Sequence, residues 1–270
     1  MNQNIKYKGE NTLSFSEYGD RNGYPILVQH GLIASINDYH LFDRLIESER
    51  RLVCMARPGY GESSPYPMAN MAEWGEIVSI LVDDLELAQF DVIGLSSGAP
   101  YSYAIGYTLP DHVRNIFIFS GTPALYDEQV LESWPYPVTK NASIAEMQKV
   151  AREVFFPNVA PEDLMRDAIR DSMRNDCFGI AQDLRIRCMD WGFSLSEIRA
   201  AAYMEHSRTD GEVPFVTAEL TARMIPNCRL TAREGEHFSK ETLDRFIRNI
   251  VLSHAQKWTR ISASAGDVST

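Results

Sequence analysis

Residues 90–100 read FDVIGLSSGAP, an apolar run that ends in small residues and continues into a segment of helical character. Because a short apolar run of this kind is typical of a buried strand, Ser96 falls in the turn between a strand and a helix. The spacing Gly94-x-Ser96-x-Gly98 suits such a turn, since only glycine-sized neighbours avoid collisions where the backbone is strained. The turn exposes the serine hydroxyl at a helix N-terminus, where unpaired backbone N–H groups can stabilise an oxyanion.

A strand–helix rhythm surrounds this turn. Apolar runs predict strands at 25–29, 51–56, 90–95 and 113–119. Helical spacing of apolar residues predicts helices at 38–47, 68–87 and 99–109. Strands that alternate with helices pair in parallel and carry helices on both faces of the sheet. The fold class is therefore α/β, with a mostly parallel central sheet.

One turn near the N-terminus predicts a hairpin. An alternating segment begins at Leu13 and ends in the turn 19–23, which contains the pair Asn22-Gly23. Asn-Gly favours the tight turns that match the twist of two paired strands. We therefore expect the segments on either side of this turn to pair.

The alternation breaks between Thr122 and Ile198, where helical spacing at 144–155, 161–173 and 178–189 indicates a helical insertion. The rhythm resumes with a strand at 201–206, a helix at 215–224, a strand at 229–232 and a closing helix at 240–252. We expect a core of residues 1–121 and 200–260 and a helical cap of residues 122–199. Residues 261–270 are small and polar, so we expect them to form a disordered tail.

Composition excludes several classes of protein. The chain has 270 residues, 44% of them hydrophobic, which is typical of a globular protein with a substantial core. Its net charge of −11 argues against binding to nucleic acid or to anionic membranes. The sequence shows no signal peptide and no run long enough to span a membrane, so we expect a cytoplasmic protein. The four cysteines are scattered and are expected to be reduced, without the spacing of a metal site.

Four features, taken in order and spacing, resemble the α/β-hydrolase family from about Leu13 to His254. They are the strand end at His30-Gly31, the turn 58–63, the serine turn at Ser96, and a histidine before the last helix. The resemblance implies a serine hydrolase with a triad in the chain order serine, acid, histidine. The chemistry requires the same parts, because a serine hydroxyl needs a base with a pKa near 7 and that base needs a carboxylate partner.

His237 is the best candidate for the base, because it follows the last predicted strand, where the family places its histidine. His30 is the strongest rival, although the resemblance assigns its stretch to the oxyanion-hole loop. The other histidines lie without a partner pattern on predicted helices, turns or strand ends: His40, His112, His206 and His254.

Asp210 is the candidate for the acid. It lies in the segment 206–214, which resembles the acid loop of the family and has Val213-Pro214 three and four residues later. An exposed Asp-Gly turn is the structural alternative, and Glu205 and Glu212 are the fallback acids. Glu236 departs from the family pattern, since many relatives have glycine before the histidine.

The remaining site residues follow from the resemblance. We expect the backbone N–H groups of Leu32 and Ser97 to form the oxyanion hole. Large residues of the insertion either line a substrate pocket or pack the insertion itself. The candidate pocket residues are Leu95, Trp134, Tyr136, Trp191 and Phe238.

The resulting prediction is acyl transfer to water, in which Ser96 attacks a carbonyl with His237 as base. No metal or organic cofactor is needed, and the substrate is a small to medium ester, thioester, amide or β-diketone-like compound. A small-molecule binding protein with vestigial catalysis, a cofactor-free perhydrolase and an insertion that binds a partner remain alternatives. The oligomeric state, monomer or homodimer, is open.

Overall fold

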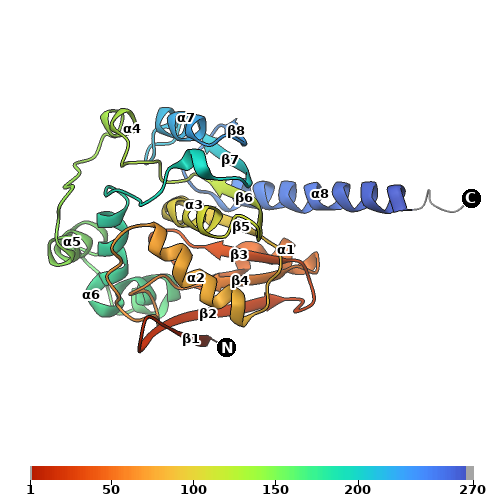
Figure 1. Cartoon of the computed structure of the whole chain (residues 1–270). Helices are drawn as coiled ribbons and strands as arrows, with labels where there is room; N and C mark the ends of the chain where they lie inside the picture. The colour runs from red at the N-terminus through yellow and green to blue at the C-terminus, as the bar shows by residue number, and fades with distance from the viewer. Residues whose placement is uncertain (1, 266–270) are drawn as a thin grey trace, which may run out of the picture.

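The computed structural model describes residues 2–265, and its centre is an eight-stranded sheet in the order β1-β2-β4-β3-β5-β6-β7-β8 (Figure 1). The first two neighbour pairs, β1–β2 and β2–β4, are antiparallel, and the pairs from β4 to β8 are parallel. The strands are β1 (Gln3–Tyr7), β2 (Asn11–Gly19), β3 (Pro25–Gln29), β4 (Arg51–Met55), β5 (Phe90–Leu95), β6 (Val113–Phe119), β7 (Ala201–Ser207) and β8 (Cys228–Arg233). The predicted α/β class with a mostly parallel sheet is confirmed.

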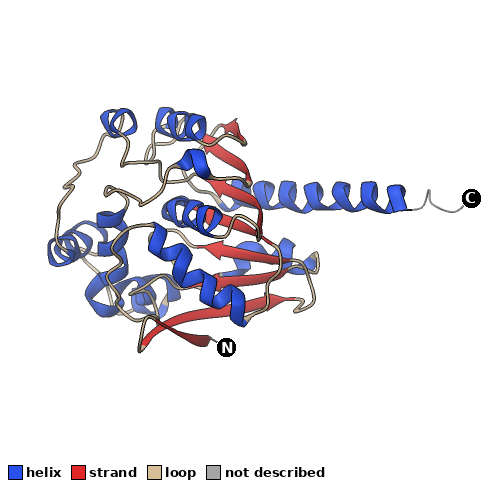
Figure 2. Cartoon of the chain, in the orientation of Figure 1, coloured by secondary structure: helices blue, strands red, loops and turns tan. Residues whose placement is uncertain are grey.

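Helices cover both faces of the sheet, because the central strands are apolar on both sides. In β5, Val92 packs in the core beneath α2 (Ala72–Asp84) and α3 (Ala99–Thr108). Its neighbour Ile93 packs in the core beneath α1 (Asp43–Glu47) and α8 (Lys240–Ala265). Figure 2 shows the resulting three layers, with α2 and α3 in front of the sheet and α8 behind it. The helix α7 (Phe215–Met224) joins β7 to β8.

The hairpin predicted at the turn 19–23 is wrong. The turn forms, with the Gly23 N–H donating to the Asp20 carbonyl at 2.9 Å, but β4 lies between β2 and β3. The antiparallel partner of β2 on its other side is β1, a strand that the sequence analysis did not identify. Turn propensity acts on a few residues, whereas strand order depends on which apolar faces are buried together.

The chain between β6 and β7 is helical wherever the structure assigns regular elements, as predicted. The elements are α4 (Glu128–Glu132), α5 (Ile144–Val150), η3 (Ala151–Phe155), η4 (Asp163–Met165), α6 (Asp167–Ile186) and η5 (Leu195–Glu197). Helix α6 covers the second half of the helix predicted at 161–173 and most of the one predicted at 178–189, and its backbone leaves helical geometry between them at Arg174–Cys177. In Figure 1, α5 and α6 lie together on the side toward which β3 points.

Helix α8 runs beyond the body of the fold in Figure 1. It continues to Ala265, so residues 261–265 are helical where the sequence predicted a tail, and residues 266–270 lie outside the described part of the chain. Within residues 2–265, no helix combines the length and the apolar character needed to cross a membrane.

Candidate active site

Ser96 occupies a strained turn between β5 and α3. Its backbone φ angle is +46°, in the left-handed region that residues other than glycine rarely adopt. A Cβ atom on Gly94 would lie 2.4 Å from Ser102 Oγ, and one on Gly98 would lie 2.2 Å from the Gln29 carbonyl oxygen. Both glycines are therefore required by close approach of their neighbours, as the spacing predicted. At Gly31 the nearest atom would be 3.9 Å away, so this glycine is not required for the same reason.

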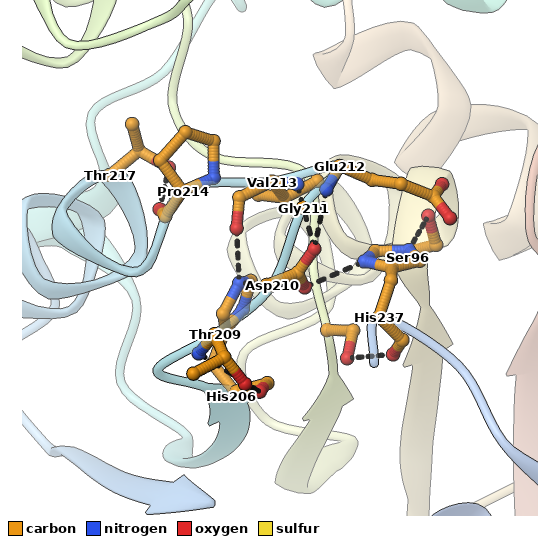
Figure 3. A network of polar contacts seen from close by, with 12 residues as sticks. Ser96, His206, Thr209, Asp210, Gly211, Glu212, Val213, Pro214, Thr217 and His237 are labelled. Carbon is orange, nitrogen blue, oxygen red and sulfur yellow. Dashed lines mark hydrogen bonds and ion pairs between the residues drawn. The ribbon is translucent and has the colours of Figure 1, made fainter. Parts of the chain in front are cut away.

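Ser96, His237 and Asp210 form one chain of hydrogen bonds (Figure 3). The His237 Nε2 atom lies 3.0 Å from Ser96 Oγ, and its Nδ1 atom lies 2.8 Å from Asp210 Oδ2. The three residues follow β5, β7 and β8, and the carboxyl ends of parallel strands meet at one edge of a sheet. The sheet therefore brings together side chains that are far apart in the sequence.

The Asp210 carboxylate is held by donors on both oxygens. Oδ1 accepts hydrogen bonds from the backbone N–H groups of Glu212 and Val213, each at 2.9 Å. Oδ2 lies 3.2 Å from His206 Nε2 in addition to His237. Burial alone would raise the pKa of Asp210, but the hydrogen bonds from His206, His237 and Val213 lower it below its usual range. Asp210 is therefore an anion at neutral pH.

His206 is a neighbour of the site that the sequence analysis missed. It is fully buried, and its Nε2 atom lies 2.9 Å from the Val213 carbonyl oxygen, which identifies this nitrogen as the protonated one. Its Nδ1 atom has no hydrogen-bond partner within the described residues. The only available signal was the four-residue spacing between His206 and Asp210 at the end of a strand.

The backbone of His237 is anchored by two more residues that the sequence analysis did not select. The His237 carbonyl oxygen accepts hydrogen bonds from Ser120 Oγ and from Arg233 Nη2, each at 2.6 Å. Arg233 also donates to the Glu236 carbonyl at 2.7 Å. Two side-chain donors, Ser120 and Arg233, thus fix the loop that carries His237. Glu236 contributes to the same network by accepting a hydrogen bond at its backbone carbonyl.

His30 does not compete for Ser96. Its Nδ1 atom lies 2.7 Å from the Gly31 carbonyl oxygen, and its Nε2 atom accepts the backbone N–H of Arg57 at 3.4 Å. Burial and the positive charge of Arg57 lower the pKa of His30 well below its usual value. Both ring nitrogens are thus engaged with backbone groups, and the ring stays neutral.

A cleft of about 930 Å³ opens above Ser96 and His237. Leu32 lies in its wall, together with the predicted pocket residues Leu95 and Phe238. Ser97, the other expected oxyanion donor, directly follows Ser96 in the 3-10 turn Ser96–Gly98 that precedes α3. The insertion contributes Phe155 and residues 165–168 to the lining. A second hollow, of about 420 Å³, lies between α8 and strands β6–β8 and includes none of the triad residues.

Three predicted pocket residues lie elsewhere. Trp191 is 0% exposed and packs among Tyr103, Tyr126 and Phe193, so the prediction that it lines the pocket is wrong. Trp134 packs against a small buried cluster beside α4, and it is not part of the cleft lining. Tyr136 is 44% exposed, and its hydroxyl donates to the Gly211 carbonyl at 3.1 Å, outside the cleft. Large aromatic residues therefore pack the insertion more than they line the site.

The sheet order and the strained serine turn define a fold of the α/β-hydrolase class. The chain belongs to this family, because the family model described as alpha/beta hydrolase fold matches residues 24–159.

Curated relatives are distant. The chain is 24% identical over 187 residues to the dihydrolipoyllysine-residue acetyltransferase component of the acetoin cleaving system of Pseudomonas putida, covering 66% of this chain and 50% of that protein. It therefore spans half the length of that relative. It is 24% identical over 225 residues to the 2-hydroxymuconate semialdehyde hydrolase of Pseudomonas sp. (strain CF600), covering 77% of this chain and 78% of that protein.

Solved structures share the fold across almost the whole chain. An esterase from Exiguobacterium antarcticum has a TM-score of 0.73 at 20% identity and covers 94% of this chain and 99% of its own. An enol-lactonase from Burkholderia xenovorans has a TM-score of 0.67 at 17% identity and covers 92% of this chain and 98% of its own. At these identities the likeness to the solved structures shows the fold alone. About function, the comparisons show that the chain belongs to a hydrolase family and has a hydrolase among its curated relatives.

Proposed function

We propose that this protein is a serine hydrolase that cleaves small to medium acyl substrates, with carboxylic esters as the first class to test. The observation that carries the proposal is the hydrogen-bonded chain from Asp210 through His237 to Ser96, which ends at the wall of a cleft. A nucleophile, a base and a group that orients the base are the minimum for acyl transfer through a covalent intermediate. Their distances are within hydrogen-bonding range without a substrate present.

In the proposed reaction, His237 removes the proton from Ser96 Oγ as this atom attacks the substrate carbonyl. The negative charge of Asp210 stabilises the imidazolium that results. The backbone N–H groups of Leu32 and Ser97 are the proposed donors to the oxyanion. His237 then protonates the leaving group and activates a water molecule, which releases the acid and regenerates Ser96. Thioesters, amides and carbon–carbon bonds next to a carbonyl fit the same sequence of steps.

The lining of the cleft supports a neutral acyl group. Its side chains near and beyond the nucleophile are mainly apolar, as in most small-molecule sites. They include Ile33, Ile36, Leu95, Phe119, Phe155 and Phe238. Glu212 adds a carboxylate to the lining, and Figure 3 shows its side chain reaching toward Ser96. A carboxylate at this position disfavours an anionic group on the substrate.

Labelling with a fluorophosphonate, followed by intact-mass analysis, tests the proposal directly. We expect a single adduct on the wild type and none on Ser96→Ala or His237→Ala, together with ester hydrolysis that is lost in both variants. Folded wild-type protein with neither adduct nor hydrolysis would overturn the proposal. Ligand-dependent thermal stabilisation that persists in Ser96→Ala would then favour a binding protein.

A further inference from the structure

Three consecutive carbonyl groups after β3 are held by side chains from the turn 57–60. Arg57 Nη1 donates to the His30 carbonyl at 2.6 Å, and Arg57 Nη2 donates to the Gly31 carbonyl at 2.9 Å. The Tyr60 hydroxyl lies 2.9 Å from the Leu32 carbonyl oxygen. Because Arg57 is only 1% exposed, these bonds are shielded from water.

Asp183, in helix α6 between β6 and β7, binds the side chains of Arg57 and Tyr60. Its Oδ2 atom lies 2.5 Å from Arg57 Nη2 and 2.9 Å from the Tyr60 hydroxyl. Its Oδ1 atom accepts the Tyr101 hydroxyl at 2.5 Å and lies 3.3 Å from Arg57 Nε. Burial and the negative charge of Asp183 raise the pKa values of Tyr60 and Tyr101 well above the usual value, so both hydroxyls remain protonated donors.

The direction of the Gly31 carbonyl decides the direction of the Leu32 N–H. The two groups belong to one peptide unit, and in a trans peptide they point to opposite sides. A carbonyl directed at Arg57 therefore aims the Leu32 N–H away from Arg57. Gly31 borders the nucleophile, since a Cβ on it would lie 4.0 Å from Ser96 Cβ, and Leu32 lies in the wall of the same cleft.

We propose that Arg57 and Asp183 are positioning residues, which orient the Leu32 N–H toward the oxyanion and make transition-state binding depend on helix α6. The inference rests on the proposed hydrolysis at Ser96. A buried guanidinium needs a buried counter-charge, so loss of Asp183 removes the group that fixes the position of Arg57 against the two carbonyls. The peptide that carries the Leu32 N–H then loses its fixed orientation. Such donors stabilise the transition state only when they are held in place before the reaction.

Four variants test this inference. Asp183→Asn keeps the shape of the side chain and removes the charge, and Arg57→Lys keeps the charge and removes the planar fork that reaches two carbonyls. Tyr60→Phe and Tyr101→Phe form a matched pair, because each removes one hydroxyl from Asp183 but only Tyr60 also contacts the Leu32 carbonyl. Each variant is compared with the wild type by circular dichroism before kinetic analysis.

The readouts are kcat and KM for 4-nitrophenyl butyrate and the affinity for butylboronic acid, which forms a tetrahedral adduct with an activated serine. We expect Arg57→Lys and Asp183→Asn to lower kcat by roughly 10- to 100-fold with KM within about threefold of the wild type. Boronate affinity should fall in parallel with kcat/KM, because both report binding of a tetrahedral species. Tyr60→Phe should lose more of both quantities than Tyr101→Phe.

The inference is overturned if the folded variants retain kcat and boronate affinity within about threefold, or if Tyr60→Phe and Tyr101→Phe behave alike. If the buried-charge variants do not fold, the tyrosine pair still decides the question, because each of its members loses a single hydroxyl. Wild-type protein that neither hydrolyses the ester nor reacts with a fluorophosphonate overturns the proposed function and this inference with it. Normal labelling with unaffected variants overturns the inference alone.

Discussion

His206 Nε2 lies 3.2 Å from Asp210 Oδ2, the carboxylate oxygen that also accepts the hydrogen bond from His237 Nδ1. Two histidine N–H groups therefore share one oxygen, and each reduces the negative charge available to the other. His206→Leu removes one donor and leaves the Val213 carbonyl without its partner, so we expect a loss of about 1–3 kcal/mol in the free energy of unfolding. The acidic limb of the kcat/KM profile should move to higher pH, because Asp210 then interacts with His237 alone.

His206→Gln is the matched control for this prediction, since its amide N–H can take the place of Nε2. We expect it to restore most of the pH profile. A His206→Leu variant with reduced stability and an unchanged pH profile would mean that His206 only packs the loop.

Asp210→Asn should lower kcat by about 10⁴-fold, because an amide does not stabilise the imidazolium and can impose the wrong histidine tautomer. Its effect on stability depends on pH. The pKa of Asp210 is lower in the folded protein than in the unfolded chain, so the carboxylate contributes stability above about pH 4 and loses that contribution as the pH falls further. Denaturant titrations from pH 7 to pH 3 should therefore show the wild type and Asp210→Asn converging at acidic pH. A constant difference over this range would contradict the assignment.

Ser96→Gly and Ser96→Ala separate catalysis from backbone strain. Both remove the hydroxyl, so both should lack detectable esterase activity and labelling. Because φ at position 96 is +46°, only glycine relieves the strain. We expect Ser96→Gly to exceed Ser96→Ala by about 1 kcal/mol in the free energy of unfolding, measured by urea denaturation. Equal stabilities would show that the turn holds no strain.

Glu212→Gln should change the preference of the enzyme for charged esters. Within residues 2–265 the Glu212 carboxylate has no hydrogen bond or ion pair, whereas the charge of Arg166 in the same cleft acts on Asp38 and Asp167 pairs with Arg170. A like charge a few ångströms away at partial exposure costs about 1 kcal/mol, so the ratio of kcat/KM for 4-nitrophenyl hemisuccinate to that for the neutral butyrate should rise roughly fivefold at low salt. The gain should shrink as salt is added.

Glu128→Gln is the control, because this exposed residue at the start of α4 lies outside the cleft and loses the same charge. A change that affects both esters equally would report on His237 rather than on substrate charge. A ratio that does not move in Glu212→Gln would show that this carboxylate does not contact the acyl group.

The sequence by itself determined the α/β class, the serine turn and the three residues that the structure joins by hydrogen bonds. These features follow from patterns within a few residues: an apolar run, the spacing of Gly94 and Gly98, and loops that follow strands. Physical constraints on a sharp turn are local, so they are visible in the sequence. The same locality explains why the helical character of the segment between β6 and β7 was predictable.

Only the tertiary structure decided the strand order, the burial of Trp191 and the partners of Arg57. The turn at Asn22-Gly23 was recognised correctly, but the strand that pairs with β2 came from elsewhere in the chain. The partner of Arg57 is Asp183, 126 residues away in α6, and no local pattern links the two. Packing of apolar faces and neutralisation of buried charge act through space, so they were settled only when β3, the turn 57–60 and α6 came together in the fold.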